Sequence, residues 1–162
     1  MSYAISRRGL RSAAAVCAAS LGLVLLSACQ KPTPLVTATV NSTTMTTEAA
    51  CYDEGRALPS GEAKKCLGEK AGKSIEVGPG DKLRVGVEPD TAESGWLLVV
   101  DGRPAMAGPV KKTYYTFSGD SLLQQQDEQG RTTMKDSARV SVAQIDDGDF
   151  KGVWHLDVRN SG

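Results

Sequence analysis

The segment Lys82-Leu83-Arg84-Val85-Gly86-Val87-Glu88 decides the fold of this chain. Apolar side chains alternate there with polar or small residues, which is the pattern of a strand buried on one face. The segment follows Gly78-Pro79-Gly80-Asp81, whose glycines and proline favour a tight turn. A turn that leads into an alternating strand is typical of antiparallel sheets, so this strand is expected to contribute its apolar face to a β-sheet core.

Similar segments lie on both sides of this strand at intervals near ten residues. Strands are predicted at residues 35–40, 73–77, 82–88, 96–100, 112–117, 138–145 and 153–158, with further candidates at 43–50 and 122–126. Turn signals separate them, at Asn41-Ser42, Asp101-Gly102 and Asp146-Asp147-Gly148-Asp149. The pattern predicts one all-β domain, residues 35–162, folded as an antiparallel immunoglobulin-like β-sandwich. The expected core contains Leu83, Val85, Val87, Leu98, Val100, Val142, Trp154 and Leu156.

The first 28 residues have the organisation of an export signal. Arg7, Arg8 and Arg11 precede an apolar run at residues 13–26, which is expected to be helical and is too short to span a bilayer. The run ends in Leu26-Ser27-Ala28-Cys29, a lipobox at which a signal peptidase cuts and the Cys29 thiol receives a lipid.

These features predict a lipoprotein signal peptide at residues 1–28 and a lipidated tether at residues 29–34. The protein is then expected on the extracytoplasmic face of the cell membrane, attached through the lipid on Cys29. An ordinary secretory signal is the alternative, and both the general and the twin-arginine export pathways stay open.

Charge narrows the classes of partner. Removing the three signal arginines leaves 16 basic and 19 acidic residues, a formal charge of −3. A mildly acidic chain without a basic run argues against nucleic acid and against electrostatic adhesion to an anionic membrane.

Cysteine usage agrees with export. Cys17 leaves with the signal, so Cys51 and Cys66 remain as a pair in an oxidising compartment, and we predict a disulfide between them. The polar segment between them is expected to form no more than a helical turn near residues 62–66. A reactive dithiol is the alternative, although such pairs usually lie two residues apart.

No catalytic, cofactor or metal site is expected. His155 is the only histidine, and it should face solvent because its neighbours Trp154 and Leu156 are expected in the core. A lone histidine without a nucleophile is not a catalytic base. The acidic cluster at residues 146–149 is interpreted as a turn and not as a calcium loop.

Residues 88–96 are the candidate binding loop, with Glu88, Pro89, Asp90, Gly95 and Trp96 as its expected contacts. A glycosidase pair of carboxylates in this loop is a weaker interpretation, because the loop is expected to be solvated. The pair Tyr114-Tyr115 is expected to place one ring in the core and one at the surface, where the exposed ring could anchor a partner.

Several motifs carry a resemblance to a known family. They are Cys29-Gln30-Lys31-Pro32-Thr33-Pro34, Glu48-Ala49-Ala50-Cys51-Tyr52, Lys73-Ser74-Ile75-Glu76-Val77, Val85-Gly86-Val87-Glu88-Pro89, Gly95-Trp96 and Lys111-Lys112-Thr113-Tyr114. Together they resemble a family of small actinobacterial lipoproteins defined by a domain of unknown function. The resemblance implies an exported lipoprotein and carries over no catalytic residues.

A weaker similarity is to the chagasin-type inhibitors of cysteine proteases. It rests on Gly80-Asp81 before a strand and on Pro89 and Gly95-Trp96 after it; residues 88–92 depart from the Asn-Pro-Thr-Thr-Gly loop of those inhibitors. We therefore expect a non-catalytic binding or envelope-associated lipoprotein with an envelope protein as a candidate partner. A small protease inhibitor is the alternative, and an enzyme is third.

Overall fold

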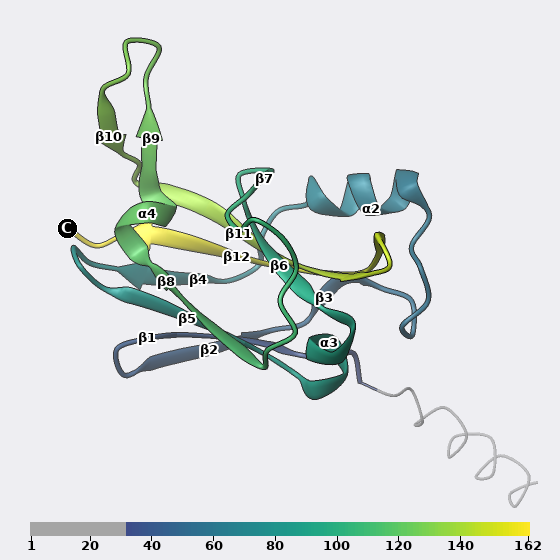
Figure 1. The fold of residues 1–162 in the computed structure, drawn as a ribbon. Helices are drawn as coiled ribbons and strands as arrows, with labels where there is room; N and C mark the ends of the chain where they lie inside the picture. Colours follow the sequence, from purple (N-terminus) through teal and green to yellow (C-terminus); the bar gives the residue numbers. More distant parts are fainter. Residues whose placement is uncertain (1–31) are drawn as a thin grey trace, which may run out of the picture. The chain divides into compact units, whose positions relative to one another are not determined.

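The computed structural model describes residues 32–162, so the predicted signal peptide and the lipidation site Cys29 lie outside the described residues (Figure 1). The compact unit of the domain runs from Thr33 to Gly162. Thr33 and Pro34, which we assigned to the tether, are thus part of this unit. Within residues 32–162, none of the helices combines the length and apolar character needed to cross a bilayer.

One layer of the domain is a four-stranded antiparallel sheet. Its strands lie in the order β2 (Thr43–Thr47), β1 (Val36–Val40), β5 (Lys82–Val87) and β8 (Tyr114–Ser118). The deciding strand β5 is central, paired with β1 on one side and with β8 on the other. The burial of this strand follows the alternation of its sequence: every second residue from Leu83 is buried.

The second layer is built on a long hairpin. It is formed by β11 (Ser137–Asp146) and β12 (Asp149–Asn160), which turn at Asp147 and Gly148 with positive φ. The sheet is completed by β6 (Trp96–Val100), β7 (Arg103–Pro104), β3 (Ala49–Tyr52) and β4 (Ser74–Val77). All these pairings are antiparallel except that β4 runs parallel to β12.

The core lies between the two layers and confirms the predicted all-β sandwich (Figure 1). Of the expected core residues, only Val100 is half-buried; the others are buried. The turn prediction at residues 146–149 is also confirmed. Burial of these apolar faces supplies the main free energy of folding, roughly 25 cal/mol per Å² removed from water.

Helices and a hairpin occupy the connections. The helices are α2 (Ser60–Leu67), α3 (Pro89–Ser94) and α4 (Gly119–Leu123). The hairpin of β9 (Gln124–Gln126) and β10 (Thr132–Met134) projects from the sandwich (Figure 1). The strand expected over residues 122–126 is present only at Gln124–Gln126; Leu122 and Leu123 instead end the helical turn α4, and both side chains are buried in the core.

Candidate functional site

The predicted binding loop, residues 88–96, forms α3 and the start of β6. Pro89 occupies the first turn of the helix, where a backbone N–H has no intrahelical partner to lose. Trp96 is fully buried, and its Nε1 donates to the carbonyl oxygen of Lys112 at 2.7 Å. Trp96 was therefore wrongly placed among the binding residues, because the apolar run that it begins is an inner strand. Gly95 is buried beside it.

The other residues of this segment stay at the surface. Glu88, Pro89 and Asp90 are exposed, and Glu88 Oε1 accepts a hydrogen bond from the backbone N–H of Leu35 at 3.0 Å. Residues 89–94 of this segment are helical, so Pro89 begins a helix and Gly95 ends it.

The predicted disulfide is present. Cys51 and Cys66 are joined with an S–S distance of 2.03 Å, which links β3 to α2. The helix is longer than the single turn expected, and it buries Ala63 and Cys66 against the sheet. Glu69 lies near the two sulfur atoms, but these are bonded to each other and offer no thiolate to a metal.

His155 is buried, contrary to the expectation that it faces solvent. Alternation does turn it away from Trp154 and Leu156, but α2 covers that face of the sheet. His155 Nε2 lies 2.8 Å from the carbonyl oxygen of Cys66, which can only accept, so Nε2 carries the proton. Its Nδ1 then accepts from the Ser141 hydroxyl at 2.7 Å.

Ser141 and His155 are hydrogen-bonded as a nucleophile and its general base would be, but solvent and substrate have no access to them. Both side chains are about 3% exposed, so a substrate cannot reach the Ser141 hydroxyl while α2 is in place. Burial lowers the pKa of His155, Arg139 lowers it further, and the Cys66 carbonyl opposes the change. The neutral imidazole therefore joins the sheet to α2 by two hydrogen bonds, one with Ser141 on β11 and one with the Cys66 carbonyl on the helix.

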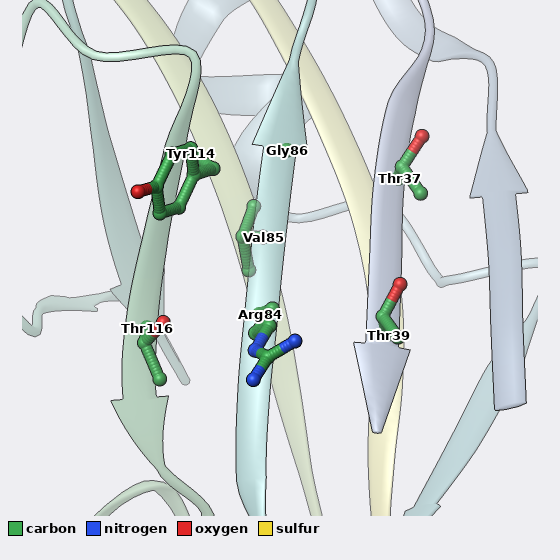
Figure 2. A pocket seen from close by; sticks show the side chains of 7 residues that line it. All are labelled: Thr37, Thr39, Arg84, Val85, Gly86, Tyr114 and Thr116. Carbon is green, nitrogen blue, oxygen red and sulfur yellow. The ribbon is translucent and has the colours of Figure 1, made fainter. Parts of the chain in front are cut away.

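A solvent-open hollow lies on the outer face of the four-stranded sheet (Figure 2). Its lining is Thr37, Thr39, Arg84, Val85, Gly86, Tyr114 and Thr116. The sheet register places Thr37, Gly86 and Tyr114 in one row across β1, β5 and β8. Thr39, Arg84 and Thr116 form the next row, so residues far apart in sequence meet on one face.

Gly86 lies in the floor of this hollow, between Thr37 and Tyr114. A β-carbon at this position would lie 3.8 Å from the Thr37 β-carbon and 3.7 Å from the Thr113 carbonyl oxygen, which are ordinary contacts. Its φ is not in the left-handed region, so neither strain nor crowding requires glycine here. The hollow has a volume of about 520 Å³, and the absence of a side chain at Gly86 keeps its floor open between Thr37 and the ring of Tyr114.

The tyrosine prediction is half correct. One ring of the pair was expected in the core, but Tyr114 is exposed at 68% and Tyr115 at 36%. The reason is that β8 is an edge strand, so its inward side chains lie at the rim of the core. Tyr115 packs instead against Phe117, with ring centroids 5.0 Å apart.

The hollow carries positive charge. Arg84 lines it, and Lys82, Lys111 and Lys112 lie close by on β5 and before β8. Within residues 32–162, none of these four side chains forms a salt bridge. Asp81 lines an adjoining hollow, where hydrogen bonds from Asn41 and from the Gly78 N–H lower its pKa.

This outer face was not predicted as a site. The alternation of residues 82–88 predicted Arg84 on the polar face of its strand, but the sequence did not show that Thr37, Thr39 and Tyr114 lie on the same face beside it. Comparison of the chain with protein-family models, with curated proteins and with solved structures found no match.

Proposed function

We propose that this protein is an exported lipoprotein whose β-sandwich is a non-catalytic binding module for an anionic, hydroxyl-rich component of the cell envelope. The observation that carries the proposal is the open hollow around Gly86. Arg84 offers a planar fork of donors to a carboxylate or phosphate, and Tyr114 offers a ring face. In contrast, the Ser141–His155 pair is sealed beneath a helix.

The entry of the chain into the domain supports membrane anchoring. The Trp154 Nε1 donates to the Pro34 carbonyl oxygen at 2.7 Å, which fixes the start of the domain. A lipid on Cys29 would be only five residues away, or on the order of 15 Å of extended chain. The lipobox, the resemblance to small lipoproteins and this short spacing together favour a domain held near the membrane.

The lipid anchor can be tested with Cys29→Ala. We expect this protein to leave the membrane fraction or to accumulate as unprocessed precursor, because the residue that bears the lipid is absent. Cell fractionation and the mass of the protein give the readout. Cys17→Ala is the matched control and should be processed and retained normally. Normal processing and membrane retention of Cys29→Ala would refute the lipoprotein assignment.

The binding face can be tested by pelleting the detergent-solubilised full chain with insoluble cell-wall material from the producing cells. Arg84→Ala should weaken pelleting on the order of tenfold, the loss expected for a charged hydrogen bond. Gly86→Ala should fold normally yet also bind less, because its methyl group projects into the floor of the hollow. Arg103→Ala removes an exposed arginine from the other sheet and should change nothing. Equal pelleting of Arg84→Ala and Arg103→Ala would rule out this face.

A further inference from the structure

In the part of the chain that the structure describes, one edge of the four-stranded sheet has no strand paired to it, and residues 105–110 border that edge only across an open hollow of about 760 Å³. Strand β8 pairs with β5 on one side, and no strand of residues 32–162 pairs with its other side. The backbone N–H of Val87 donates to the Thr113 carbonyl, and that of Gly119 donates to the Asp81 carbonyl. These bonds show that Thr113 and every second residue after it direct their backbone groups toward β5. Antiparallel strands alternate the direction of their backbone groups, so Tyr114 and Thr116 direct their N–H and C=O groups outward. No turn, loop or cap hydrogen bond among the described residues uses these groups.

At the opposite edge of the same sheet, strand β2 has a lysine side chain hydrogen-bonded to its backbone. On β2, the Thr46 carbonyl oxygen accepts a hydrogen bond from Lys73 Nζ at 2.6 Å. Lysines of this kind discourage the addition of another strand. In contrast, the segment Tyr114-Tyr115-Thr116-Phe117 has no charge and no proline, and tyrosine, threonine and phenylalanine favour strands. An open edge of this composition promotes pairing with another chain.

We propose that β8 pairs antiparallel with β8 of a second copy of this protein. A two-fold axis at Thr116 would set each Thr116 opposite its counterpart and Tyr114 opposite Ser118 of the other copy. The two Thr116 residues would exchange N–H···O bonds, and the two four-stranded sheets would become one continuous sheet. Such an interface uses the same surface on both copies and closes as a dimer.

The side chains fit this register. The same axis sets Tyr115 opposite Phe117 of the second copy, an aromatic cross-strand pair that occurs twice and covers the half-exposed Tyr115 ring. At the ends of the pair, Lys112 of one copy would face the region of Asp120 of the other. Lys112 forms no salt bridge within the described part of the chain, so the opposite charges favour a second copy over an unrelated strand.

A single strand pair buries little surface, so this dimer should be weak in dilute solution. Anchoring through Cys29, as proposed above, would hold the copies on one membrane and raise their effective concentration. Association is therefore expected on the membrane more than after dilution in detergent.

Cross-linking in membranes tests the register. Paired residues in this geometry have Cα atoms about 5.5 Å apart, within the range that a disulfide can bridge. Thr116→Cys, in the full chain, should give a band at twice the monomer mass after mild oxidation, and reductant should remove it. Thr44→Cys, on the outer face of the opposite edge strand, is the control and should stay monomeric. Oxidised Thr116→Cys that remains monomeric, or that joins a protein of another mass, would overturn the proposal.

Thr116→Pro tests the backbone bonds. Its N–H faces away from β5, so proline removes a donor from the edge without breaking the ladder. We expect dimerisation to weaken on the order of tenfold or more, since two central hydrogen bonds are lost. Thr116→Val keeps the N–H and should dimerise as the parent does, as measured by chemical cross-linking in the same membranes. Unchanged dimerisation of folded Thr116→Pro would exclude pairing through β8.

Discussion

Trp154→Ala should lower the free energy of unfolding by about 3–5 kcal/mol, the cost of removing a large aromatic side chain from a packed core. Trp154 is fully buried in β12, and its ring lies 6.2 Å from that of Tyr52. Gly152 approaches it so closely that a β-carbon there would lie 2.6 Å from the tryptophan Cη2. The backbone at Gly152 is therefore packed directly against this ring, and removing the ring leaves a cavity in the core. Chemical denaturation monitored by circular dichroism gives the measurement.

The indole N–H adds a second effect, on the entry of the chain. Trp154→Phe keeps most of the apolar bulk but loses the hydrogen bond to the Pro34 carbonyl, which is then left unpaired. Trp96→Phe is the control, because it also loses one bond from Nε1 to a backbone carbonyl, that of Lys112, at a distant place in the fold. Only Trp154→Phe should increase amide hydrogen exchange near residues 33–36. A cost below about 1 kcal/mol for Trp154→Ala, or equal exchange in the two phenylalanine variants, would contradict this account.

The sequence predicted the sandwich because its strands carry a period of two. Leu83 and Val85 on β5 and Val142 on β11 are buried as their alternation indicates. His155 shows the limit of that reasoning. Alternation states which side of the strand a residue takes, but not what covers that side. Only Ala63 and Cys66 are buried in the covering helix α2. Two buried residues give too weak an apolar pattern to predict from sequence that this helix packs on the sheet.

The candidate sites consist of residues that strand pairing brings together from distant parts of the chain. The sequence alone does not show which strands pair. Ser141 was missed because a serine in an alternating strand has no mark of a buried partner until β11 and β12 are in register. One ring of Tyr114-Tyr115 was expected in the core because nothing local showed that β8 lies at an edge. Thr37 and Arg84 meet across strands separated by more than forty residues, so their shared hollow follows from topology and not from a motif.

The double substitution Cys51→Ser and Cys66→Ser should lower the free energy of unfolding by about 2–4 kcal/mol and leave the sandwich folded. The bridge closes a loop of 15 residues, worth roughly 3 kcal/mol in the chain-entropy model. Other contacts still hold the loop to the domain when the disulfide is absent, and they limit the loss of stability. Leu58 is buried and its N–H donates to the Phe150 carbonyl at 2.7 Å, while His155 still holds the carbonyl at residue 66.

We therefore expect α2 to loosen without leaving the sheet. Limited proteolysis should cut the region of residues 52–66 first, and the β11–β12 hairpin should keep its hydrogen-exchange protection. Ala63→Gly is the matched control, because it weakens the buried face of α2 while the bridge is intact. Mass spectrometry of the exported protein checks the premise: if Cys51 and Cys66 are alkylated without prior reduction, the bridge does not form. If the double variant unfolds completely, the covalent bond, and not the core between the sheets, holds the domain together.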